Sequence, residues 1–240
     1  MKNKAKAMRN MLYGMFGAVL CMISMWLSSA YGKDNIKNGF IQSNWPKMPM
    51  YRFEAAIILI GIGVPIFYLG AKEMIKGVAL TRRKRSIGDH RMVKLFDLSM
   101  HMGAFGFLFV DGCYLAMAIV YKLLYSTNLM GADIISTVEG MFYYFAVVAI
   151  AYFVIAVGGS SIAYMYLVSQ SRIRVNKLCI VFNPLVMFGI GELMKLTKIY
   201  YLVDFAAAIV PFGYLLMLAA GMSHVAKLPA ARRRRPEERR

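Results

Sequence analysis

Residues 53–71 read FEAAIILIGIGVPIFYLGA, and Glu54 is the one charged residue among them. A bilayer core of about 30 Å is crossed by a helix of roughly 20 mainly apolar residues. In hydrocarbon the backbone groups must bond within their own segment, and this stretch lacks the apolar–polar alternation of a barrel strand. It therefore predicts a membrane-spanning α-helix.

Five further stretches of the chain are apolar over a similar or greater length. They are residues 11–31, 93–121, 140–168, 178–193 and 199–225, of which 178–193 is the shortest and contains Pro184. We therefore predict an all-α fold, a single transmembrane bundle of six spans within residues 1–228. The basic tail at residues 229–240 has little to pack and is expected to be disordered.

The composition supports a membrane protein over a soluble one. Of the 240 residues 59% are hydrophobic, and the mean hydropathy is +0.53, whereas soluble domains are about 45–50% apolar. Three scattered cysteines exclude a disulfide framework. The basic runs at residues 82–85 and 232–235 are not interleaved with stacking aromatic residues, so no nucleic-acid partner is expected.

The distribution of lysine and arginine predicts the orientation of these spans. With six spans, 22 of the 29 basic residues fall on the side that carries both termini. Basic residues concentrate in cytoplasmic loops, so both termini are expected in the cytoplasm, with the basic loops against anionic lipid head groups. The alternative is that residues 1–30 form a cleaved signal peptide, because Ser28, Ser29 and Ala30 resemble a cleavage site.

Ionisable groups inside the third span are the first candidates for function. Each costs about 2.5–3.5 kcal/mol at the centre of a membrane helix, so such groups usually face the bundle interior. At 100° per residue Asp97, His101 and Asp111 share one face about 80° wide. Their alternative is structural, since Asp97 could pair with nearby Lys94 or Arg91.

Three polar residues of the last two spans complete the candidate site. Asp204 lies within the sixth predicted span, and Glu192 closes the fifth at its outer end. Asn183 precedes Pro184, where its side chain can bond backbone groups that the proline leaves unpaired. The alternative for Glu192 is an ion pair with Lys195 or Lys198 at the membrane surface.

Together these residues predict transport or sensing of a small solute or cation through a polar pathway centred on Asp111. The transport would be proton-coupled if His101 relays protons, because histidine titrates near neutral pH. Two alternatives stay open, a membrane-embedded enzyme acting on a lipid and a non-catalytic scaffold, and a non-enzymatic role is favoured. With three histidines and no ligand motif, neither a metal site nor a cofactor is expected.

The stretch Trp45-Pro46-Lys47-Met48-Pro49, followed by Arg52, Gly61, Pro65 and Gly70, resembles small bacterial six-span membrane proteins of unassigned function. The histidine in the third span and the Asn-Pro pair in the fifth are similar too. The resemblance implies a bacterial plasma-membrane location and no particular activity. The last span contains no lysine, in contrast to the rhodopsins, and the chain lacks the multiple histidines of ceramidase-like membrane hydrolases.

Overall fold

The computed structural model describes residues 4–29, 37–38, 41–81, 87–126 and 132–228. Within these ranges the regular structure is helical apart from two short strands, β1 (Lys37–Asn38) and β2 (Ile41–Gln42), which pair antiparallel. The all-α prediction is therefore confirmed. The tail at 229–240, the basic run at 82–85 and residue 30 of the possible cleavage site lie outside the described residues.

Among the described residues, five helical stretches are long and apolar enough to cross a membrane, namely Lys4–Ser28, Met50–Ala79, Gly88–Ser126, Ser136–Ser169 and Ile209–Ala226. They correspond to α1 (Lys4–Ser28), α2 (Met50–Ala79), α3 (Ile87–Ser126), α4 (Ala132–Phe153) with α5 (Gly159–Ser169), and α8 (Ile209–Ala226). A π-helical turn, η2 (Val154–Gly158), joins α4 to α5. The first four predicted spans thus coincide with long helices. Each helix begins before the predicted start of its span, and all but α1 also end after the predicted end.

The predicted fifth span, residues 178–193, is a short 3-10 helix, η3 (Lys177–Val181), followed by α6 (Pro184–Leu196). Asn183 begins α6, because its Oδ1 accepts a hydrogen bond from the amide of Val186 at 3.0 Å and Pro184 suits the first helical position. Just after the helix, Lys198 has a left-handed backbone, with φ 57°. At 13 residues, α6 is about 20 Å long, short of the bilayer core.

The predicted sixth span, residues 199–225, is divided into α7 (Tyr200–Ala206) and α8. Pro211 lies in the first turn of α8. A proline there has no amide to donate to the residue four positions earlier, so it fits a helix start and not a helix interior. This explains why the helix is interrupted at Ala207 and Ala208.

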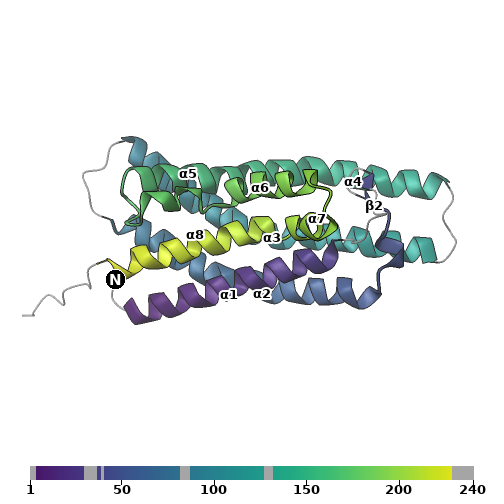
Figure 1. Ribbon diagram of the computed structural model, residues 1–240, viewed down its shortest axis with the longest axis horizontal. Coiled ribbons are helices and arrows are strands. Elements are labelled where there is room, and N and C mark those ends of the chain that lie inside the picture. Colours follow the sequence, from purple (N-terminus) through teal and green to yellow (C-terminus); the bar gives the residue numbers. More distant parts are fainter. Residues whose placement is uncertain (1–3, 30–36, 39–40, 82–86, 127–131, 229–240) are drawn as a thin grey trace, which may run out of the picture.

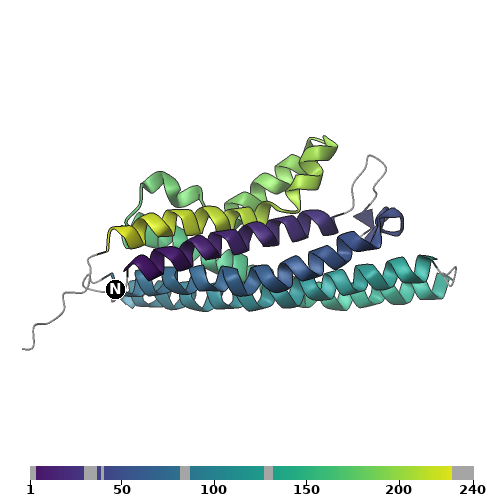
Figure 2. The same cartoon turned by 90° about the horizontal axis from the view of Figure 1, so that it is seen from below.

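The long helices run side by side along the longest axis of the molecule (Figure 1). The main packing partners are α1 with α2 and α8, α2 with α3, and α3 with α5. The short helix α6 packs on α7 and on α8, and α6 and α7 rise away from the other helices in Figure 2. The Lys4 side chain donates to the carbonyl of Ala226, so the start of α1 and the end of α8 share one end of the bundle, here called the terminal end.

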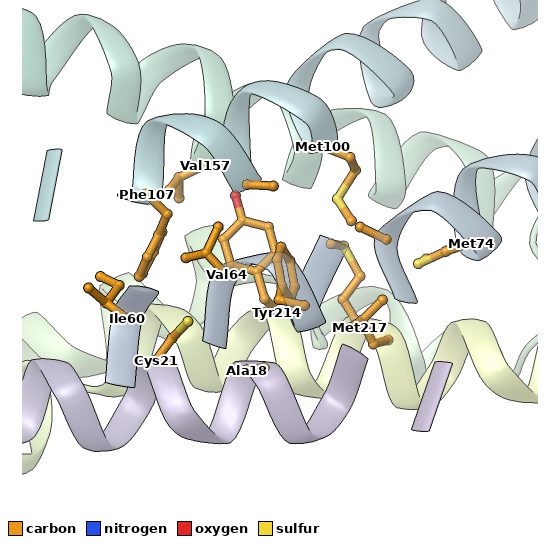
Figure 3. Close-up of a cluster of buried hydrophobic side chains, with 14 of the residues drawn as sticks. Ala18, Cys21, Ile60, Val64, Met74, Met100, Phe107, Val157, Tyr214 and Met217 are labelled. Carbon is orange, nitrogen blue, oxygen red and sulfur yellow. The ribbon is translucent and has the colours of Figure 1, made fainter. Parts of the chain in front are cut away.

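The core between these helices is apolar and rich in methionine (Figure 3). Tyr214 of α8 lies at its centre, and Val64 and Phe107 lie beside it. At the opposite end of the bundle, here called the loop end, the short helix η1 (Trp45–Lys47) follows the two strands. Trp45 is fully buried there against Tyr114 and Phe142. These three aromatic rings pack together at the loop end.

Candidate functional site

The described part of the chain contains a cavity of about 500 Å³ whose lining includes Ser28 and Ser29 at the end of α1 and Gln42 of β2, so it lies toward the loop end. It lies between α1, α3, the α4–η2 region and the α6–α7–α8 segment. Most of its wall is apolar, and several lining groups are polar. The polar lining residues are Ser24, Ser28, Ser29, Gln42, Asp111, Tyr114, Tyr152, Glu192 and Lys195.

Asp111 is the acidic group on the inner wall of this cavity. It stands on α3, and its Oδ2 is buried without a hydrogen-bond partner among the described residues. Buried carboxyl groups almost always have such a partner. An orphaned carboxyl oxygen beside an open cavity therefore marks the place where a ligand, a proton or water would supply the missing interaction.

The other polar groups around the cavity are largely engaged with the protein. Gln42 donates from Nε2 to the hydroxyl of Tyr114 at 3.0 Å, and Tyr152 donates to the carbonyl of Gly103 at 2.7 Å. Ser24 donates to the carbonyl of Ala56 at 2.7 Å. These bonds hold the wall in place and leave Asp111 as the chemically distinctive group.

Glu192 marks the rim of the cavity. Its Oε1 lies 2.5 Å from Nζ of Lys195, one turn further along α6. Both side chains are well exposed, and both line the cavity. The structure thus places Asp111 and Glu192 on the same cavity, with the charge of Glu192 already compensated by a lysine.

Asp97 and His101 lie elsewhere on α3. His101 Nδ1 is 3.1 Å from Oδ1 of Asp97 and 2.8 Å from its carbonyl oxygen. The two side chains are 51% and 38% exposed, respectively, and the His101 ring contacts the ring of Tyr68 on α2 edge-on. This pair is therefore on the outer surface of the bundle, and neither residue lines the cavity.

Asn183 and Asp204 also stand apart from the cavity lining. Asn183 is fully buried and spans the η3–α6 junction, since its Nδ2 donates to the carbonyl of Ile180 while its Oδ1 begins α6. Asp204 is half-buried on α7, two residues before Ala206, which does line the cavity. The structure gives Asn183 a role in shaping the fold around the cavity.

The described residues include no group of three or more His, Cys, Asp or Glu side chains that could hold a metal ion. Ser160 and Ser161 form contacts that link neighbouring helices. Ser160 lies 3.4 Å from the hydroxyl of Tyr214, and Ser161 accepts the amide of Leu185 at 3.1 Å. Neither forms a hydrogen bond with His101, so the described contacts contain no serine–histidine pair.

Sequence reasoning missed Gln42, Tyr114 and Tyr152 as cavity residues. Gln42 lies between predicted spans, where helical periodicity carries no information. Tyr152 fits against Gly106 of α3, since a Cβ added to Gly106 would lie 1.9 Å from Cε2 of Tyr152. Such a pairing is visible only once the helices are placed together.

A family model described as a family of unknown function (DUF6796) matches residues 1–228. The chain belongs to this family. No curated protein matches the chain, and no solved structure matches it. Membership of DUF6796 agrees with the resemblance to membrane proteins of unassigned function, and it leaves the assignment of an activity to the geometry of the cavity.

Proposed function

We propose that this member of DUF6796 is an integral membrane protein that binds a small solute or cation in the Asp111 cavity, as a step in transport or sensing. The observation that carries the proposal is the orphaned Oδ2 of Asp111 beside a cavity of about 500 Å³. Volumes of roughly 300–1,000 Å³ are typical of small-molecule sites. The five long apolar helices support the membrane setting.

The proposal includes six passages with both termini in the cytoplasm of a bacterial cell. The contact between Lys4 and Ala226 supports an even number of passages, because the two ends of the chain then lie on one side. Five long helices give an odd number, and η3 with α6 supplies the sixth, partial passage. The concentration of lysine and arginine on that side supports a cytoplasmic orientation.

In this orientation the cavity is reached from outside the cell. Its lining includes the exposed Glu192–Lys195 pair and the carboxyl group of Asp111, whose Oδ2 is buried. The low dielectric of a membrane interior strengthens the attraction of an unpaired carboxylate for a cation. The Asp97–His101 pair belongs to the opposite half of α3 and lies outside the cavity lining.

The lipid-enzyme alternative finds less support in this geometry. Acid–base chemistry needs a proton-transfer group within hydrogen-bond reach of the reacting atom. The one histidine of the predicted pathway, His101, is paired with Asp97 on the outer surface, while the cavity holds Asp111 without a histidine.

The experiment is ion flux into proteoliposomes with Asp111→Asn, with Asp97→Asn as the matched control on the same helix. Flux is driven by a potassium diffusion potential and followed as proton movement with a pH-sensitive dye. We expect a flux above that of protein-free vesicles, its loss in Asp111→Asn and its retention in Asp97→Asn. Equal flux in wild type and Asp111→Asn would exclude Asp111 from transport.

A sensor gives a different result that the same variants can test. In that case wild type and Asp111→Asn both match protein-free vesicles in flux. Solute-dependent stabilisation of the protein against unfolding is then expected in wild type and Asp97→Asn, and it is expected to vanish in Asp111→Asn. If no solute in a broad panel stabilises the wild-type protein and no flux is seen, the proposed function is wrong.

A further inference from the structure

We propose that the cavity takes one organic monocation, a protonated amine or quaternary ammonium with an apolar body, whose charge lies at Asp111 and whose body lies against the aromatic wall. This inference rests on the proposed function and names its ligand class. It is argued from the charge, the lining and the hydrogen bonds of the cavity.

The charge of the cavity matches a single positive charge. Two carboxylates line it, and Glu192 is paired with Lys195 at 2.5 Å. Among the described residues, Oδ2 of Asp111 is buried and has no hydrogen-bond partner. One uncompensated carboxylate therefore remains, which balances one monovalent cation.

The ligand set does not suit a dehydrated inorganic ion. Calcium takes six to eight oxygen ligands, and magnesium requires near-octahedral geometry and keeps several waters. The described residues hold no cluster of acidic, histidine or cysteine side chains that could bind a metal. Asp111 is the one acidic side chain on the inner wall of the cavity, whereas such an ion would need several oxygen ligands.

The walls suit an organic cation instead. Aromatic faces attract ammonium groups within about 6 Å of the ring centre, most strongly where water is excluded. Two of the rings already contact each other, with Phe153 and Phe188 centred 4.7 Å apart. The aromatic residues that line the cavity are Phe107, Tyr114, Phe145, Tyr152, Phe153 and Phe188.

The hydrogen bonds of the lining argue against a strongly polar solute. A sugar or nucleotide carries many donors and acceptors, and each one buried without a partner costs binding free energy. Here Ser24 donates to Ala56, Ser28 donates to Met25, and Tyr152 donates to Gly103. A ligand with one charged group and an apolar body makes the fewest demands on such a wall.

The test is equilibrium binding of radiolabelled benzyltrimethylammonium to the full-length protein in nanodiscs of zwitterionic lipid. We expect one saturable site per chain, competed by unlabelled benzyltrimethylammonium and not by its neutral carbon isostere neopentylbenzene. Asp111→Asn should weaken binding about tenfold to a hundredfold, as expected for a contact with a charged group. Asp97→Asn, on the same helix and outside the cavity, should leave the affinity within about twofold, because pairs of distant sites rarely couple.

A second variant separates charge from space. Ala149 lines the cavity from α4, so Ala149→Phe fills part of the volume while Asp111 stays in place. This variant should also lose benzyltrimethylammonium. Lowering the pH should weaken binding to the wild type, because a proton and the cation compete for the same carboxylate.

Three results would overturn the inference. The first is no saturable binding of benzyltrimethylammonium to a folded wild-type protein. The second is equal binding in wild type and Asp111→Asn. The third is displacement of the radiolabelled ligand by rubidium or sodium ions at concentrations where unlabelled benzyltrimethylammonium does not displace it. If benzyltrimethylammonium fails while ion flux still depends on Asp111, the ligand class is wrong and the proposed function stands. If neither binding nor flux nor solute-dependent stability depends on Asp111, both are wrong.

Discussion

A methyl group added at Gly17 would clash with the backbone of α2. A Cβ built there lies 2.3 Å from the amide nitrogen of Phe67, 2.5 Å from the carbonyl oxygen of Gly63 and 2.8 Å from Cα of Phe67. Ordinary contacts between such atoms are about 3.5–4.0 Å. Because all three neighbours are backbone atoms, no side chain can rotate away, and α1 and α2 must separate by about 1 Å.

The expected cost follows from the loss of this close packing. Overpacking a tight interface costs about 1–3 kcal/mol, and helices in membranes associate chiefly through van der Waals packing between small residues. Gly61, on α2, is the matched control, since a Cβ there meets nothing within 4 Å. Gly61→Ala should stabilise by about 0.4–1 kcal/mol, because it narrows the unfolded ensemble without a clash.

The assay is unfolding of the purified protein from mixed micelles with increasing SDS, followed by far-ultraviolet circular dichroism. Gly17→Ala should unfold at a lower SDS fraction than wild type, and Gly61→Ala at an equal or higher one. Both variants carry the same chemical change, so the difference reports the α1–α2 contact. Equal stability of Gly17→Ala and Gly61→Ala would refute the close approach of the two helices.

Two further predictions concern the terminal end and the orientation of the bundle. Asp89→Ala should destabilise the protein by about 3–5 kcal/mol in the same assay, because it leaves the guanidinium of buried Arg172 without its carboxylate. The double variant Asp89→Leu with Arg172→Met should regain most of this stability. A double variant as unstable as Asp89→Ala would contradict this account of the ion pair. In a variant without native cysteines, Lys47→Cys should react with an impermeant maleimide in intact cells, and Lys227→Cys only after permeabilisation; both side chains are exposed, and the opposite pattern would reverse the orientation.

The helices were predictable from the sequence because apolar length is a local property. The run at residues 53–71 must satisfy its own backbone in hydrocarbon, whatever its neighbours are, and α2 spans it in full. The end of α6, three residues beyond the predicted end at residue 193, was predictable only approximately. Lys198 has a left-handed backbone, a conformation that glycine usually adopts after the end of a helix. Because a lysine stands there, the usual sequence signal for a helix that ends at Leu196 is missing.

For the candidate site, the sequence predicted how residues are arranged around a single helix, but not which neighbouring helices they face. The helical wheel relates Asp97, His101 and Asp111 by angle, but an angle does not identify the neighbouring helix. Along its 40 residues, α3 meets α2 near His101, where Tyr68 contacts the imidazole, and borders the cavity at Asp111. Residues on one face therefore enter different surroundings, and Gln42 arrives from a loop that has no periodicity.

The interruptions of the helices explain why a cavity exists at all. Protein interiors are packed to high density, so six uninterrupted helices would fill the space beside Asp111 with side chains. Instead the break between α7 and α8 places Ala207 on the wall, and the π-helical turn η2 adds Val157. The hydroxyl of Tyr214 donates to the carbonyl of Ala156 within that turn at 3.1 Å, which satisfies a backbone group at an irregularity that hydrocarbon would otherwise penalise. The hydrogen bond from Tyr214 makes η2 a specific part of the packed fold, and η2 and the break between α7 and α8 both contribute residues to the cavity that Asp111 lines.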